Sequence, residues 1–192
     1  LPGIRYDLIR RNPKILIGYS DITALHLALY RYAGLVTFHG PVASSSPTDY
    51  TVTQMQAVLM NPRPETTIYM SIENQRRAET QPAFAMRTIR PGIAEGRLTG
   101  GNLSVLAALI GTPYAATLRN HLLFLEDVSE APYRVDRMLT QLDQAAGLNN
   151  AAGCVLGVFT RGDSPKGDRS LTMEQVIDHH FAPLKGPSLY GG

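Results

Sequence analysis

The segment from Lys14 to Phe38 constrains the fold more than any other part of the sequence. It opens with a short apolar run, residues 14–18, which is typical of a buried strand. Residues 20–33 follow at once with apolar side chains at helical spacing, Gly34 ends that pattern, and residues 35–38 predict a second strand. This order of strand, tight turn, helix and strand indicates a βαβ unit and hence an α/β fold with a mostly parallel sheet.

The rest of the chain divides into a less regular stretch and a second α/β region. After a predicted helix at residues 51–60, residues 61–92 are rich in polar residues and proline, with one candidate strand at 67–72. We therefore expect a first α/β domain at residues 1–64, a linker at 65–90 and a second domain at 91–192. In the second domain the patterns predict strands at 122–125, 154–159 and 188–190, and helices at 103–110, 133–146 and 172–181, the last with Thr172 as its N-cap.

Composition excludes several classes of function. The net charge of the 192 residues is only +2, and no basic tract exceeds an arginine pair, so we expect no nucleic-acid partner. The longest apolar stretch, residues 103–110, is too short to span a membrane. Cys154 is the only cysteine, which excludes an intrachain disulfide, and its apolar neighbours favour a buried, unreactive side chain.

The turn Gly18-Tyr19-Ser20-Asp21 is the first candidate for chemistry. A serine between a strand and a helix can form a nucleophile elbow, in which the N–H of Asp21 and the helix N-terminus face a developing oxyanion. This interpretation predicts a strand end near Gly18, a helix start within two residues of Ser20, and a strained backbone at Ser20. The motif departs from G-x-S-x-G because Ile22 stands where the second glycine belongs. The alternative is that Ser20 is only a helix N-cap.

Two further groups of polar residues follow predicted strands. Glu126, Asp127 and Glu130 come after the apolar run 122–125, where they either serve a site or are solvated acids before a helix. Gly100-Gly101-Asn102 reads as a turn between a strand and a helix, with Asn102 as an N-cap or an anion-binding residue. That turn is too short for a dinucleotide or P-loop motif, so we expect no cofactor.

Of the histidines, His39 is the one that the pattern places where it could reach a cleft. His26 is expected to pack within its helix and His121 to face solvent. His179 and His180 stand beside Asp178 and invite a metal interpretation, but no third ligand is evident in the sequence. A favourable interaction with the helix C-terminus is the simpler explanation, and no metal is predicted.

The same stretches resemble a known family. The segments that carry the resemblance are Pro13 to Leu25, Thr37 to Pro41, Gly100 to Leu103, Leu125 to Val128 with Glu130, and Pro132 to Arg137. In order and spacing they are similar to the LD-carboxypeptidase family, which includes muramoyltetrapeptide carboxypeptidases and the microcin C self-immunity proteins. The resemblance runs from Tyr6 to the end of the chain.

The resemblance implies a Ser-His-Glu triad with Ser20 as nucleophile and Glu126 as the acid, with Glu130 as second choice. It implies that the N–H of Asp21 is one oxyanion donor and that His39, Gly101 and Asn102 line a possible substrate cleft. The family's histidine and its second oxyanion donor would lie after Gly192 and before Leu1. We therefore expect a chain cut from a longer protein at both ends and inactive by itself.

For the function, the resemblance implies a serine carboxypeptidase that releases terminal D-alanine from murein tetrapeptides during cell-wall recycling. It also implies a cytoplasmic homodimer without metal or cofactor. One alternative is a hydrolase of a peptide–nucleotide toxin, as in the self-immunity branch of the family. The other is a non-catalytic ligand-binding α/β domain in which Ser20 only caps a helix.

Overall fold

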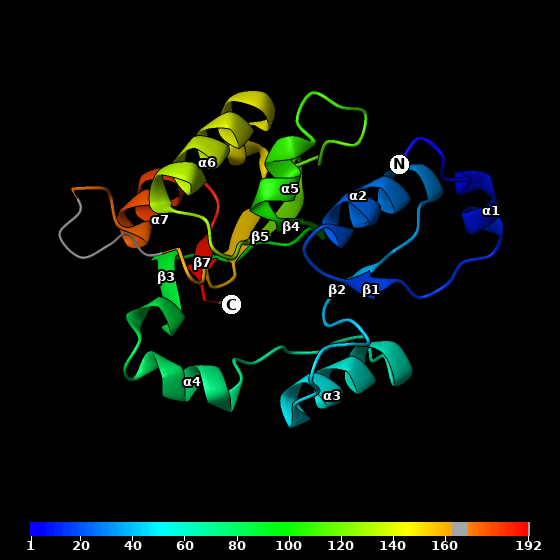
Figure 1. The fold of residues 1–192 in the computed structure, drawn as a ribbon, viewed down its shortest axis with the longest axis horizontal. Helices are drawn as coiled ribbons and strands as arrows, with labels where there is room; N and C mark the ends of the chain where they lie inside the picture. Colours follow the sequence, from blue (N-terminus) through cyan, green and yellow to red (C-terminus); the bar gives the residue numbers. More distant parts are fainter. Residues whose placement is uncertain (163–168, 192) are drawn as a thin grey trace.

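The computed structural model describes residues 1–162 and 169–191, which contain two sheets flanked by helices (Figure 1). The smaller sheet pairs β1 (Ile17–Gly18) with β2 (Phe38–His39) in parallel. The larger sheet has five strands in the order β3-β7-β6-β5-β4. The predicted α/β class and its mostly parallel sheets are therefore confirmed, although β1 and β2 are shorter than the apolar runs suggested.

Four strands of the larger sheet are parallel neighbours, and each step from one to the next crosses over through a helical segment. They are β4 (Arg97–Asn102), β5 (His121–Glu126), β6 (Gly153–Leu156) and β7 (Ser188–Tyr190). The crossover helices are α5 (Leu103–Ala108), α6 (Pro132–Ala146) and α7 (Met173–Phe181), with a short 3-10 helix at Leu148–Asn150. Strands β5 and β7 and the three crossover helices lie where the sequence patterns predict them. Strand β6 ends at Leu156, before the end of the predicted run 154–159, and β4 extends through residues 100–102, where a turn was expected.

The core lies between this sheet and its helices. Leu123 and Leu125 of β5, Leu139 of α6 and Phe181 of α7 are completely buried. The apolar face of α6 follows from its sequence, because Val135, Leu139 and Leu142 recur at helical spacing. Helix α7 begins at the predicted N-cap, Thr172, which forms a capping box with Gln175.

The N-terminal part consists of α1 (Tyr6–Arg11), β1, α2 (Ile22–Ala33) and β2. Helix α2 ends at Gly34, whose φ of 66° is the left-handed conformation that glycine adopts at low cost. Helix α2 packs on the larger sheet, where the hydroxyl of Thr23 accepts a hydrogen bond of 3.0 Å from the backbone N–H of Asn102. The two sheets are thus joined by a buried polar contact.

The stretch predicted to be a linker is more regular than expected. Helix α3 (Asp49–Met55) continues into a π-helix at Gln56–Met60, in agreement with the helix predicted there. Residues 67–71 form no strand and Ile72 begins α4 (Ile72–Ala78), so the strand expected at 67–72 is wrong. Ser71 is the N-cap of α4, because its hydroxyl accepts a hydrogen bond from the N–H of Asn74. A 3-10 helix at Pro82–Phe84 follows α4.

The expected end of the linker at residue 90 also needs correction. Strand β3 (Arg87–Arg90) pairs antiparallel with β7 and forms one edge of the larger sheet. Residues 87–90 therefore belong to the second α/β unit. The short length of β3 explains why its alternating pattern is weak in the sequence.

No helix within residues 1–162 and 169–191 has the length and apolar character needed to cross a membrane.

The close packing around β4 gives a stability prediction. A Cβ atom at Gly100, which has φ of 123°, would lie 1.9 Å from the carbonyl oxygen of Phe124 on β5. We expect Gly100→Ala to lower the free energy of unfolding by roughly 2–6 kcal/mol, because a strained φ and overpacking each cost about 1–3 kcal/mol. Urea unfolding of the purified chain measures this change.

Gly111→Ala is the matched control. Gly111 also has a positive φ, 82°, but nothing lies within 4 Å of its added Cβ. This variant should therefore show the backbone strain alone. Equal losses in the two variants would contradict the close approach of β4 and β5.

Candidate functional site

Ser20 lies on a sharp turn between a strand and a helix. Strand β1 ends at Gly18 and α2 begins at Ile22, and Ser20 has a φ of 57°, a conformation that is uncommon for a residue other than glycine. The three local predictions for this turn are therefore confirmed. Gly18 permits the turn because a Cβ there would lie 2.8 Å from the side chain of Ile22.

The polar groups of this turn are available for chemistry. Ser20 is exposed, and within the described residues its hydroxyl makes no hydrogen bond. Its carbonyl accepts the N–H of Thr23 at 2.9 Å, whereas the N–H of Asp21 has no acceptor among the described residues. A helix N-cap has extended backbone angles and accepts a hydrogen bond through its side chain, and Ser20 does neither. The simple N-cap alternative therefore does not describe this serine.

His26 supports the turn from the first half of α2. It is buried, and its Nε2 lies 3.0 Å from the carbonyl oxygen of Gly18, the last residue of β1. The sequence predicts only that His26 packs within its helix. Its contact with the strand end has no sequence signal, because the partner is a backbone atom.

The carboxyl ends of one strand from each sheet bring His39 and Glu126 together. His39 ends β2 and Glu126 ends β5, and Nε2 of His39 lies 3.8 Å from Oε1 of Glu126. The two side chains are 23% and 19% exposed. The His39 ring also stands edge-on to Phe124, with 5.2 Å between the ring centres. His39 pairs with Gly18 across the smaller sheet, and Ser20 comes two residues after Gly18. Ser20 therefore lies at the same carboxyl edge of the smaller sheet as His39.

Burial sets the charge of both groups. Desolvation, together with the nearby His26 ring, lowers the pKa of His39 to about 4, so His39 is neutral at neutral pH. Desolvation raises the pKa of Glu126, with a smaller contribution from Asp127, and the Asn102 side chain acts in the opposite direction. The contact between His39 and Glu126 is therefore no ion pair at neutral pH. Within the described residues, Oε1 of Glu126 has no hydrogen-bond partner.

Asp127 behaves differently from its neighbour. It is buried and accepts hydrogen bonds from the Asn102 amide at 3.1 Å, from its neighbour's N–H (Val128) at 2.8 Å, and from the N–H and hydroxyl of Ser104 at 2.9 and 2.7 Å. All of these donors belong to the protein. Asp127 therefore fixes the end of β5 against the start of α5, which leaves Glu126 as the acid without a structural role.

The glycines before Asn102 lie elsewhere than predicted. Gly100 and Gly101 are inside β4 rather than in a turn, and a Cβ at Gly101 would lie 2.6 Å from the Thr23 hydroxyl. Asn102 is the predicted N-cap of α5, since its Oδ1 accepts the N–H of Val105. Gly101 and Asn102 are buried, and Asn102 pairs in register with Glu126. The anion-binding turn is thus corrected to a packing contact, and a cleft role for these two residues stays a prediction.

The remaining candidates have contacts or surroundings of their own. Glu130 lies 3.6 Å from Arg134 in α6 as an ion pair. His121 begins β5, and its Nδ1 is 2.9 Å from the Arg119 carbonyl oxygen. His39 lines an open hollow of about 860 Å³, which neither Ser20 nor Glu126 lines. Cys154 is buried as predicted, and burial raises its thiol pKa to about 12.

Comparisons with known proteins agree with this architecture. The model of the LD-carboxypeptidase C-terminal domain matches residues 95–192, and that of the LD-carboxypeptidase N-terminal domain matches residues 1–40. The chain belongs to the LD-carboxypeptidase family. This membership confirms the resemblance seen in the sequence.

Three relatives illustrate the range of this family. The chain is 39% identical over 189 residues to the "Probable murein peptide carboxypeptidase" of Bacillus subtilis, covering 98% of this chain and 57% of the relative. It is 30% identical to the "Microcin C7 self-immunity protein MccF" of Escherichia coli, covering 82% of this chain and 51% of the relative. The crystal structure of muramoyltetrapeptide carboxypeptidase from Oxalobacter formigenes matches with a TM-score of 0.80 and 28% identity, over 100% of this chain and 62% of that one. The chain thus spans between half and two thirds of the length of these LD-carboxypeptidases.

The raised pKa of Glu126 predicts a stability change. Because the folded pKa exceeds the unfolded one, folding takes up a proton between the two values, and stability falls as pH rises through that window. Glu126→Gln removes the buried charge, so we expect this variant to unfold at higher urea concentration than the parent chain at pH 7. The difference should vanish below about pH 4, where the unfolded glutamate is protonated as well.

Glu130→Gln is the control for this measurement. It removes the Glu130–Arg134 ion pair, in which Arg134 is more than half exposed, so we expect little or no change in stability at pH 7. A destabilised Glu126→Gln variant at pH 7 would contradict burial as the dominant influence on this carboxyl group.

Proposed function

We propose that this chain is the nucleophile- and glutamate-bearing part of a serine-type LD-carboxypeptidase that releases terminal D-alanine from murein tetrapeptides. In this proposal Ser20 is the nucleophile, Glu126 is the triad acid and the Asp21 N–H is an oxyanion donor. The observation that carries it is the strained, exposed Ser20 with a free hydroxyl at the carboxyl edge of a parallel sheet. A role in cytoplasmic cell-wall recycling and a homodimeric assembly belong to the same proposal.

The chemistry follows the logic of a serine triad. The Ser20 hydroxyl attacks the carbonyl carbon of the peptide bond that links the preceding residue to the terminal D-alanine. The proton of the hydroxyl passes to an imidazole. Glu126 orients that imidazole and stabilises its cation, while the Asp21 N–H binds the oxyanion at the start of α2. The imidazole then protonates the leaving amine, and water hydrolyses the acyl-enzyme to restore Ser20.

The imidazole of this reaction is not His39 in our proposal. A base works best when its pKa lies near the working pH, and a pKa of about 4 makes His39 a weak proton acceptor. We therefore assign the base to a histidine of the full-length protein outside residues 1–192. His39 instead packs beside Glu126 and Phe124 and helps to exclude water from the carboxyl group.

Two observations favour Glu126 over Glu130. Glu126 comes directly from β5, so the sheet fixes its backbone, and its Oε1 is buried without a partner among the described residues. Glu130 already has Arg134 as an ion-pair partner. We propose that roughly 6–8 Å separates the side-chain oxygens of Ser20 and Glu126, the span that one imidazole bridges.

A second candidate function is hydrolysis of a peptide–nucleotide toxin. The relatedness to the microcin C7 self-immunity protein supports it, as does a 26% identical crystal structure of that protein "in complex with Adenosine Monophosphate", with a TM-score of 0.79. Both candidates use the same nucleophile and acid. Comparing turnover of a murein tetrapeptide with that of an aminoacyl-nucleotide conjugate separates them.

Ser20→Ala tests the nucleophile in the full-length protein. Release of D-alanine from a murein tetrapeptide should fall by several orders of magnitude, on the order of 10⁶ in a well-studied serine protease, while the circular dichroism spectrum stays unchanged. Ser46→Ala, which changes another exposed serine, is the control and should retain full turnover. Retention of activity within about tenfold in Ser20→Ala would favour the non-catalytic ligand-binding alternative.

The two glutamates are compared in the same assay. Glu126→Gln should lower turnover by up to about 10⁴-fold, because the imidazolium loses its stabilising charge. Glu130→Gln should change turnover far less. The reverse order would transfer the triad role to Glu130 without affecting the family assignment.

A further inference from the structure

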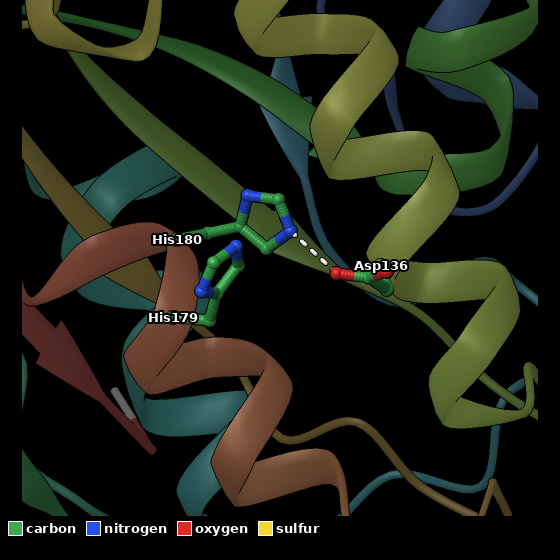
Figure 2. Close-up of side chains that lie close together, drawn as sticks. All are labelled: Asp136, His179 and His180. Atoms are coloured by element: carbon green, nitrogen blue, oxygen red, sulfur yellow. Dashed lines mark hydrogen bonds and ion pairs between the residues drawn. The ribbon is translucent and has the colours of Figure 1, made fainter. Parts of the chain in front are cut away.

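Helices α6 and α7 bring one acid and two histidines together (Figure 2). They are Asp136 of α6 and His179 and His180 of α7, and one ligand atom from each lies within 4.8 Å of the others. We propose that these residues form a binding site for a divalent transition-metal ion of the zinc class. Imidazole nitrogen and carboxylate oxygen are donors that Zn²⁺, Ni²⁺ and Cu²⁺ accept readily.

The core of the protein holds these donors in place. Asp136 follows the buried Val135 in α6, and His180 lies three residues after the buried Ile177 in α7. Both helices pack against each other through these apolar neighbours. The donors therefore stand on rigid elements, so binding an ion would cost little conformational entropy.

The contacts within the cluster suit a site that is closed on one side and open on the other. The His180 side chain is only 8% exposed, and its Nε2 lies 2.9 Å from Oδ1 of Asp136. His179 is exposed, and its ring stands edge-on to that of His180 at 5.0 Å between centres. An ion can enter from the His179 side, bind Nε2 of His180 and a carboxylate oxygen of Asp136 in place of their mutual hydrogen bond, and complete its coordination with water.

The simpler explanation is that both histidines only complement the C-terminus of α7. It requires neither the contact of His180 with Asp136 of α6 nor the place of His179 in the same cluster. Consecutive helical residues do not normally face each other, yet both rings stand together here (Figure 2). Asp178 does not compete for this place, because it forms an ion pair of 2.6 Å with Arg87.

Zinc should cross-link α6 and α7 in the folded chain only, and it should therefore raise the thermal unfolding temperature. The experiment titrates Zn²⁺ into the tag-free chain after chelator treatment, with calorimetry for affinity and a thermal scan for stability. We expect one ion per chain and a higher unfolding temperature, reversed by chelator. Neither readout depends on peptidase activity, so the result stands apart from the proposed function.

His179→Ala is the decisive variant, because an exposed side chain can be removed without disturbing the fold. It should weaken Zn²⁺ binding at least about tenfold and reduce the rise in unfolding temperature at the same zinc concentration. His121→Ala removes an imidazole outside the cluster and should bind Zn²⁺ as the parent chain does. Asp136→Asn should also weaken Zn²⁺ binding. The unfolding temperature of this variant without zinc separately measures the effect of changing its contact with His180. Absence of Zn²⁺ binding in the parent chain, or equal binding in His179→Ala, would overturn the proposal.

Discussion

The candidate site depends on the close contact between α2 and β4. Thr23 accepts the N–H of Asn102, and Gly101 lets the two backbones approach because any Cβ there would collide with the Thr23 side chain. One such hydrogen bond contributes only about 0.5–1.5 kcal/mol, but an unpaired N–H in this buried place would cost more. This contact joins the smaller sheet to the larger one. It thereby brings the strand ends that carry Ser20 and His39 to the side of the sheet where Glu126 emerges.

The adjacent acids Glu126 and Asp127 at this edge differ in their hydrogen-bond partners. Asp127 is surrounded by donors from the protein, whereas the Oε1 atom of Glu126 has none among the described residues. Burial raises the pKa of Glu126 and lowers that of His39, so both side chains favour their neutral forms more than in water. A buried carboxyl group in this state gains stability when a cationic partner arrives. In the proposed reaction an imidazolium beside Glu126 would be such a partner and would favour the charged carboxylate, the form in which a triad acid acts.

Sequence patterns predicted local elements well and the contacts between them poorly. The turn at Ser20 and the capping box of α7 follow from neighbouring residues, and both were predictable. Strand β3 was not, because its four residues gain stability from pairing with β7, almost 100 residues later in the chain. For the same reason the packing role of Gly101 and the approach of Asp136 to His180 have no local signal. The acids after β5 could be listed from the sequence, but only their hydrogen bonds distinguish Glu126 from Asp127.

The central claim is that Ser20 and Glu126 flank one imidazole in the full-length protein. A crystal structure of that protein with a non-hydrolysable murein tetrapeptide tests it most directly. We expect an imidazole hydrogen-bonded to both Ser20 and Glu126. The carbonyl carbon of the residue that precedes D-alanine should lie about 3–3.5 Å from the Ser20 hydroxyl. An imidazole paired with Glu130, or a peptide bound away from Ser20, would contradict it.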